Sequence, residues 1–263
     1  MGAKLKSTVL NLKNVQYKNI LKNITFDLEE NSINVLIGPN ACGKTTLVKC
    51  ILGLLDYKGI IEYNGNRLQI TKEIGVYSSF LDLLEKSVFD NLMFPLINLG
   101  LEEKLAKKMV YDITKNILID DILNTNVKEL SNIQKKKVLI ALSLIHSPKL
   151  LIFDDCLEEF NPSYKVRIIN YLKKISSECT ILFLTNKSDN IMFADKIIVM
   201  NDGETKFDGD LNKLVNDEKI LISNGITLPQ AVDLSNKLKS YELINENVFD
   251  VDKMVNKIWQ EQE

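Results

Sequence analysis

Residues 38–46, with the sequence GPNACGKTT, match the pattern G-x-x-x-x-G-K-[ST] of a phosphate-binding loop. The glycines let backbone amides turn inward around an anion, and a following helix adds its N-terminal amides and the positive end of its dipole. Lys44 is predicted to reach the β and γ oxygens of a nucleotide, and the Thr45 hydroxyl to ligate Mg²⁺. The predicted nucleotide-binding residues of this loop are Gly38, Asn40, Ala41, Cys42, Gly43, Lys44, Thr45 and Thr46.

Two carboxylates stand at the end of the apolar run 150–155, LLIFDD. Such a run is typical of a central parallel strand, whose carboxyl end reaches the ligand edge of an open sheet. Of the two carboxylates, Asp154 and Asp155, one is predicted to hold Mg²⁺ through water and the other to orient or deprotonate the attacking water. Together with the loop, these paired acids predict nucleotide hydrolysis.

The elements that position these groups follow from periodicity. Residues 33–37 read as a buried strand and residues 47–52 have helical spacing, so the loop lies between strand and helix. Residues 7–28 alternate apolar and polar around the polar segment 18–23, which predicts an antiparallel pair. Tyr17 lies at its turn and is predicted either to stack on an adenine or to be a half-exposed strand residue.

The remainder of the main unit alternates strands and helices. Strands are predicted at 60–63 before an Asn-Gly turn, at 74–77, at 180–185, and at 196–200 before a turn at 201–203. The apolar spacing becomes helical over residues 81–127, so a helical insertion is expected at about 81–133. This order predicts an α/β fold with helices on both faces of the sheet.

Residues 1–208 form the predicted nucleotide-binding domain. Residues 209–263 have a different pattern, that of short amphipathic helices. Pro229 and Asp250 are each expected to begin a short amphipathic helix. We expect this C-terminal helical unit to serve dimerisation, and Trp259 to pack on either the main domain or a second copy.

The composition of the chain argues against several classes of protein. With 33 Lys and Arg against 35 Asp and Glu, the chain has no basic field suited to nucleic acid. The four cysteines form no C-x-x-C pair, and no leader is expected at the N-terminus, which favours a reducing cytoplasm. No run approaches the ~18 apolar residues of a membrane-spanning helix, so any transport pathway would belong to another chain.

These motifs resemble the nucleotide-binding subunits of ABC transporters over residues 8 to about 208. The segment 130–134, LSNIQ, opens a helix twenty residues before the double-acid strand, at the place of the family's signature. The tail segment 225–230, GITLPQ, followed by Leu234 and Leu238, resembles the ATPase subunits of energy-coupling-factor importers, the cobalt and vitamin uptake type. The segments 89–92, FDNL, and 99–101, LGL, fit the insertion of the same group.

The resemblance implies a P-loop NTPase fold with an antiparallel β subdomain, a helical insertion and a C-terminal helical extension. It implies two facing subunits with ATP and Mg²⁺ between them. Tyr17 would stack on adenine and Asp154 would hold Mg²⁺. Ser131 and Gln134 would contact the partner's ATP.

Several residues depart from the family's pattern. Ser79 stands where a Gln is usual, Asn186 where a switch His is usual, and Asp155 where a catalytic Glu is usual. Asn132 and Ile133 replace two signature glycines, and Ile is poorly suited to positive φ or close approach to phosphate. Asn161 replaces the Asp of the loop after the double-acid strand. These changes predict that ATP binding is better preserved than hydrolysis.

The first interpretation is therefore an ATPase subunit of an energy-coupling-factor importer, on the cytoplasmic face of the membrane. Its expected partners are a second ATPase subunit, a transmembrane coupling subunit and a substrate-binding membrane subunit. The alternatives are a nucleotide-binding regulatory or structural subunit without turnover, and a soluble ABC-type ATPase of translation or repair.

Cys42 also carries a hypothesis of its own. It lies in the loop beside Lys44 and a helix N-terminus, where a thiol pKa tends to fall. We expect alkylation of Cys42 to block ATP binding and to be slowed by ATP; the alternative is an inert small residue.

Overall fold

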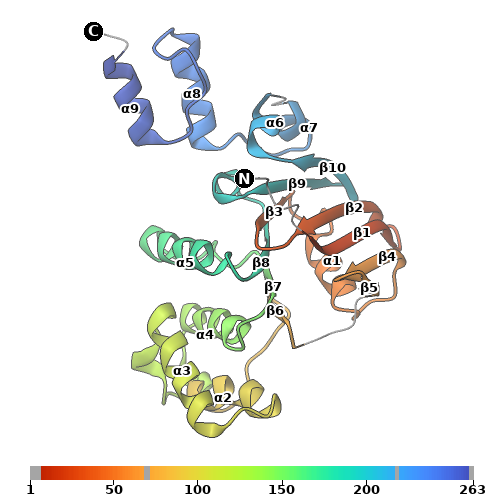
Figure 1. The fold of residues 1–263 in the computed structure, drawn as a ribbon, viewed down its shortest axis with the longest axis vertical. Helices are drawn as coiled ribbons and strands as arrows, with labels where there is room; N and C mark the ends of the chain where they lie inside the picture. The colour runs from red at the N-terminus through yellow and green to blue at the C-terminus, as the bar shows by residue number, and fades with distance from the viewer. Residues whose placement is uncertain (1–6, 68–71, 217–218, 261–263) are drawn as a thin grey trace.

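The computed structural model describes residues 7–67, 72–216 and 219–260. The ends of the two predicted units, residues 1–6 and 261–263, lie outside the described residues. Within the described ranges, ten strands form one mixed sheet in the order β5-β4-β1-β2-β10-β9-β3-β8-β7-β6 (Figure 1). The predicted α/β fold is confirmed.

Five neighbouring strands make the parallel part of this sheet. They are β6 (Ile74–Tyr77), β7 (Leu150–Asp154), β8 (Thr180–Thr185), β3 (Ile33–Ile37) and β9 (Lys196–Asn201). Every residue of β3, β7 and β8 is buried, which explains why each reads as an apolar run without alternation. The strands predicted at these positions are confirmed.

The antiparallel part confirms the predicted strand pair and the Asn-Gly turn. It consists of β1 (Thr8–Tyr17), β2 (Leu21–Glu29), β4 (Lys58–Tyr63) and β5 (Asn66–Arg67). The strand β10 (Glu204–Gly209) pairs with β9 in antiparallel fashion and with β2 in parallel fashion, so it joins the two parts.

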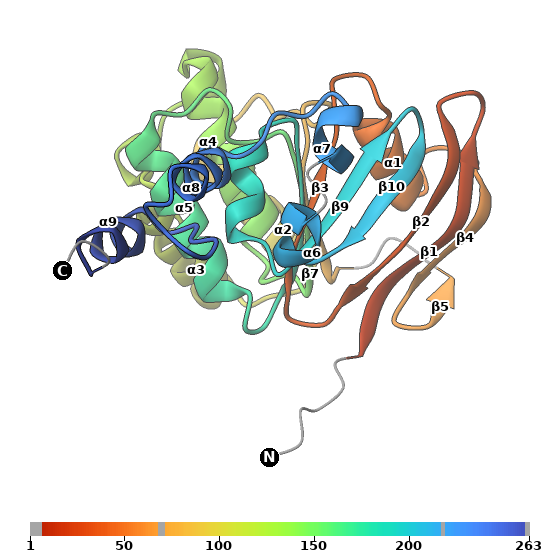
Figure 2. The ribbon, with the colours of Figure 1, turned by 90° about the horizontal axis from the view of Figure 1, so that it is seen from above.

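The two faces of the parallel strands are covered by different elements. Leu36 packs with the helix α1 (Lys44–Ile51) and the antiparallel strands, whereas Val35 packs with the helices on the other face. Figure 2 shows α1 on one side of these strands and α4 on the other. The helices of the second face are α2 (Val88–Asn98), α3 (Glu103–Ile117), α4 (Asn132–Leu144) and α5 (Pro162–Ile175).

Short 3₁₀ helices connect these elements. They are η1 (Asp120–Ile122), η2 (Val127–Glu129) and η3 (Ser188–Phe193). The helical character predicted for residues 81–127 begins only at Val88, as α2 and α3 with η1 and η2 after them; residues 81–87 form no helix. In the described part of the chain no helix is both long and apolar enough to cross a membrane.

The C-terminal helices follow β10, and α8 and α9 extend away from the sheet (Figure 1). They are α6 (Leu211–Asn216), α7 (Lys219–Ser223), α8 (Gln230–Ser240) and α9 (Val251–Gln260). The starts predicted at Pro229 and Asp250 are confirmed, because Pro229 precedes α8 and the Asp250 carboxylate accepts the Lys253 amide at 2.9 Å.

The C-terminal segment contacts the main unit just before α8. The Gln230 amide donates to Asp189 Oδ1 at 2.8 Å, and the Ser188 and Thr227 hydroxyls lie 3.3 Å apart. Ile226 is buried. Trp259 is 68% exposed, so it does not pack on the main unit in this chain.

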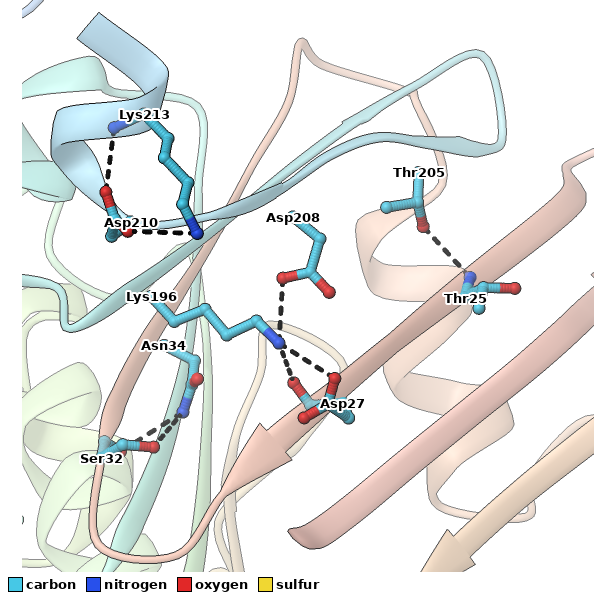
Figure 3. Close-up of polar contacts among 9 residues, drawn as sticks. All are labelled: Thr25, Asp27, Ser32, Asn34, Lys196, Thr205, Asp208, Asp210 and Lys213. Atoms are coloured by element: carbon cyan, nitrogen blue, oxygen red, sulfur yellow. Dashed lines mark hydrogen bonds and ion pairs between the residues drawn. The ribbon is translucent and has the colours of Figure 1, made fainter. Parts of the chain in front are cut away.

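A charged cluster ties β2, β9 and β10 together at the amino-terminal ends of β3 and β9 (Figure 3). Lys196 Nζ lies 3.1 Å from Asp27 Oδ1 and 2.9 Å from Asp208 Oδ1. Burial acts to lower the pKa of Lys196, but the hydrogen bonds and charges of Asp208 and Asp27 outweigh it and hold that pKa above its usual value.

Candidate functional site

The loops after β3, β6, β7 and β8 meet at one edge of the sheet, because these parallel strands are neighbours and end on the same side. That edge brings together the phosphate loop, the serine pair 78–79, the two acids 154–155 and Asn186. Ligands of open α/β sheets bind at the carboxyl ends of strands.

The phosphate loop has a backbone that only small residues allow. A Cβ on Gly38 would lie 2.1 Å from the Met200 carbonyl oxygen, and Gly43 has φ +109°. Ala41 also has positive φ, at 62°. The helix α1 begins at Lys44, and its N-cap residue, Gly43, makes no side-chain hydrogen bond to the N-terminal amides. This leaves them available to an anion.

Lys44 is bound to its own loop. It is buried, and its Nζ donates to the carbonyl oxygens of Gly38 at 3.0 Å and Pro39 at 3.2 Å. A hollow of about 270 Å³ lies beside it, lined by Ile20, Asn40, Ala41, Gly43, Lys44, Thr45, Thr46 and Asp155. Ile20 was not predicted, and no motif identifies it, because it comes from the turn between β1 and β2.

Asp154 is buried at the end of β7 and accepts a hydrogen bond from Ser78. The Ser78 hydroxyl lies 2.8 Å from Asp154 Oδ2, and Asp154 Oδ1 has no partner among the described residues. Ser78 is fully buried and was missed by sequence reasoning, which selected Ser79. The signal is strand register: Tyr77 pairs with Phe153, so the next residues, Ser78 and Asp154, are also neighbours.

The residues present fit Mg²⁺ completed by phosphate rather than a site made of protein alone. A hydroxyl at Thr45 and the free carboxylate oxygen of Asp154 are the hard oxygen ligands that Mg²⁺ takes. No group of three or more His, Cys, Asp or Glu side chains in the described part of the chain could hold a metal ion. Mg²⁺ usually keeps waters and binds one or two protein ligands plus substrate phosphates.

Asp155 lines the hollow with positive φ, at 49°, and its amide donates to the Leu184 carbonyl at 3.1 Å. Burial raises the pKa of its carboxyl, while the Lys44 charge acts in the opposite direction. Asn186 Nδ2 donates to Asn40 Oδ1 at 2.8 Å, so the predicted switch position contacts the phosphate loop directly. Ser79, by contrast, is exposed.

The hypothesis that the Cys42 pKa falls is wrong. Cys42 is buried, and this burial raises the pKa of its thiol; the nearby Lys44 charge lowers it by less. The loop folds over its own thiol, so desolvation of the thiolate exceeds the helix-end and lysine effects.

Tyr17 lies beside the phosphate hollow rather than in it. Its ring is half-buried, Lys18 Nζ lies 5.1 Å from the ring centroid, and the ring lines a neighbouring hollow of about 500 Å³ with Leu54 and Leu55. The Tyr17 carbonyl accepts the Ile20 amide at 3.0 Å, which connects the two hollows along the chain.

Ser131 and Gln134 form the capping box of α4, far along the chain from the loop. The Gln134 amide donates to Ser131 Oγ at 3.3 Å, and the Ser131 amide to Gln134 Oε1 at 2.9 Å. Because α4 and α1 cover opposite faces of the sheet, the structure does not bring these residues to the chain's own phosphate loop (Figure 2).

The sequence raises two objections to Asn132 and Ile133 in place of the signature glycines, and the structure removes the one that concerns positive φ. Both lie in the first turn of α4 and neither has positive φ, so Ile133 requires no strained backbone there. Its side chain packs against the core. Asn161 caps α5, accepting the Tyr164 amide at 2.9 Å.

Comparison with known proteins agrees with this geometry. The ABC transporter family profile matches residues 21–158. The energy-coupling factor transporter ATP-binding protein EcfA of Pediococcus pentosaceus is 30% identical, over 85% of this chain and 86% of its own. The EcfA2 protein of Caldanaerobacter subterraneus is 32% identical, over 83% of this chain and 82% of its own.

Solved structures share the fold. CbiO1 of Clostridium perfringens, described as part of the ABC transporter complex cbiONQ, superposes with a TM-score of 0.70 at 24% identity, covering 86% of this chain and 98% of that one. An ATP-binding subunit of an ABC transporter superposes with a TM-score of 0.73 at 21% identity, covering 81% and 94%.

The fold and the phosphate loop define a P-loop nucleotide-binding protein of the α/β class. The family match and the two relatives go further: this chain belongs to the ABC transporter family of ATP-binding proteins. The relatives are transporter subunits, so the comparisons do not support the alternative of a regulatory or structural subunit without turnover.

Proposed function

We propose that this chain is an ATP-binding subunit of an energy-coupling-factor type ABC importer, which couples ATP binding and hydrolysis to micronutrient uptake through membrane partners. One observation carries the chemistry. The phosphate loop and the buried Asp154 lie at the carboxyl ends of β3 and β7, on either side of β8, and Asp154 keeps one oxygen without a partner among the described residues.

Each residue of the site has a proposed role. The loop amides and Lys44 bind the phosphates, Thr45 and Asp154 hold Mg²⁺, and Tyr17 stacks on the adenine. When bound, Mg²⁺ supplies charge neutralisation at the phosphate oxygens. Ser131 and Gln134 contact ATP in the partner's site, since α4 lies on the opposite face of the sheet from α1, which follows the chain's own loop.

We propose that this chain's own site hydrolyses ATP slowly. Asp155 is one methylene shorter than Glu, and a misplacement of ~1 Å costs roughly 10²-fold in rate. Asn186 donates to Asn40 and carries no charge for a γ-phosphate. Ser79 is short and exposed, so it cannot replace a long amide side chain that reaches the metal site.

The proposed assembly is a heterodimer with a second ATPase subunit, bound at the cytoplasmic face of the membrane to a transmembrane coupling subunit and a substrate-binding subunit. Two copies of this chain would pair two incomplete sites. Residues 209–263 are proposed to help dimerisation, supported by the exposed apolar side chains of α8 and α9, Leu234, Val255 and Trp259.

The test is mild detergent extraction of a tagged chain from its own cells, with identification of proteins that co-purify in stoichiometric amount. A membrane protein and a second ATPase subunit are expected. A lone chain, or a partner without membrane segments, would contradict the importer assignment. ATP binding by the purified chain, measured separately, tests the site itself.

A further inference from the structure

Ser78 is a fully buried hydroxyl on which neither the family pattern nor the proposed mechanism depends. We infer that Ser78 is a positioning residue for the metal site: it holds Oδ2 of Asp154 and thereby presents Oδ1 to Mg²⁺. This inference rests on the proposed function, and it assigns to Ser78 a link between the end of β6 and the metal that Ser79 cannot make.

The geometry of this contact is set by the sheet. β6 and β7 pair in parallel register from Ile74 opposite Leu150 to Tyr77 opposite Phe153. The residues that follow this last pair are Ser78, just after β6, and Asp154, the last residue of β7, and the Ser78 hydroxyl lies 2.8 Å from Asp154 Oδ2. Both residues are buried, at 0% and 3% exposure, so water does not compete for this hydrogen bond.

The pattern of hydrogen bonding distinguishes positioning from simple support of the fold. A buried carboxylate is costly unless its oxygens are satisfied, and native structures satisfy nearly all such atoms. Here one oxygen is satisfied by Ser78 and the other has no partner among the described residues. A hydroxyl that fixes one oxygen while the other stays free is what a metal ligand requires of its supporting group.

The adjacent residue provides a contrast. Ser79 has the same hydroxyl but is exposed, and it lies one residue further than Ser78 from the last pair of β6 and β7, Tyr77 with Phe153. Of this Ser-Ser pair, only Ser78 is placed by the strand register against the acid.

The test compares Mg²⁺ dependence of nucleotide binding in the full chain and its variants. Ser78→Ala, Ser78→Thr and Ser78→Cys are titrated with a fluorescent ATP analogue, first in EDTA and then across Mg²⁺ concentrations. The matched control is Ser143→Ala, because Ser143 is also buried but donates to the Ile140 carbonyl in its own helix at 2.7 Å.

For Ser78→Ala we expect the Mg²⁺ concentration at half-saturation to rise about 10-fold, the lower end of what loss of a ligand's supporting group costs. Binding in EDTA should stay unchanged. Ser78→Thr, which keeps the hydroxyl, should restore the Mg²⁺ dependence, and Ser143→Ala should match the parent chain.

Three results would overturn the inference. An unchanged Mg²⁺ requirement in Ser78→Ala would do so, as would an equal loss of binding with and without metal. If Ser78→Ala does not fold, Ser78→Cys provides the same readout with a weaker donor, and a parental Mg²⁺ requirement there would count against Ser78. Failure of the unmodified chain to bind the analogue would instead refute the proposed function.

Discussion

Charged side chains are paired differently at the two ends of the central strands. At the amino-terminal ends, Lys196 lies between two carboxylates, those of Asp27 and Asp208. At the carboxyl ends, Lys44 donates to two carbonyl oxygens and Asp154 keeps an oxygen without a partner in the described residues. The first arrangement is complete within the chain and stabilises the fold, whereas the second leaves interaction energy for a ligand.

The largest expected effect concerns the carboxyl ends of the strands, where one substitution should weaken nucleotide binding. Replacing Lys44 by Ala should weaken ATP binding by about 10²- to 10³-fold, because it removes a preorganised cation from the hollow that faces the phosphates. Equilibrium titration with a fluorescent ATP analogue measures this loss.

The control for that variant is Lys49→Ala. Lys49 lies in the last turn of α1 with its Nζ 5.1 Å from the Phe80 ring centroid, outside the loop. The Lys49→Ala variant should bind nucleotide like the parent chain. Tight binding retained by Lys44→Ala would remove the phosphate loop from the proposal.

The second prediction concerns the amino-terminal ends of the strands, where a substitution should alter the stability of the fold rather than nucleotide binding. Replacing Lys196 by Met leaves two partly buried carboxylates unpaired and should lower the free energy of unfolding by about 2 kcal/mol. Urea denaturation measures it, and ATP affinity should not change. Lys213→Met is the matched control, since that lysine is 72% exposed and 3.5 Å from its acid.

This second effect has a defined pH dependence. Because the folded-state pKa of Lys196 is raised above the ordinary 10.5, its contribution to stability is complete below pH 10.5 and is lost as pH rises through the folded-state pKa. The difference between parent and Lys196→Met should therefore narrow in strongly alkaline solution. A constant difference would show that lost packing, not charge, causes the destabilisation.

The third prediction sharpens the account of the carboxyl end. Combining Asp155→Glu with Asn186→His should raise ATP hydrolysis by about 10-fold, since each change restores reach or charge near the phosphates. Phosphate release by the complex with its ATPase partner measures the rate. A rate equal to the parent would place the defect elsewhere in the site.

The smallest expected effect concerns Cys42. Because burial raises the pKa of its thiol above the ordinary 9.0, the thiolate is scarce at neutral pH and alkylation should be several-fold slower than that of free cysteine. Peptide mapping after iodoacetamide treatment separates Cys42 from the other three thiols. The rate should rise with pH, and faster labelling than free cysteine would contradict the buried loop.

Much of this arrangement could be predicted from the sequence, for physical reasons that particular residues illustrate. The run before Asp154 is apolar without alternation because β7 is buried on both sides, and that pattern is visible in the chain. The glycines of residues 38–43 are required by positive φ and by contact with Met200, so the loop motif carries its own geometry.

Other features depend on which strands become neighbours, and no local pattern reports that. Ser78 and Ser79 are chemically identical in the sequence, and only the register of β6 against β7 places Ser78 on Asp154. The Cys42 pKa likewise depends on how completely the loop covers its thiol, which spacing from Lys44 does not reveal.

The hydrogen bonds from Lys44 to the Gly38 and Pro39 carbonyls have a consequence for selectivity. The Gly38 and Pro39 carbonyls compete with an incoming anion for two of the three N–H donors of the Lys44 ammonium. A single small anion such as inorganic phosphate offers little to offset that exchange, whereas a nucleotide triphosphate also contacts the remaining amides of the loop. Without its nucleotide, two donors of Lys44 are thus satisfied within the loop, which favours a triphosphate with many contacts over a small anion with few.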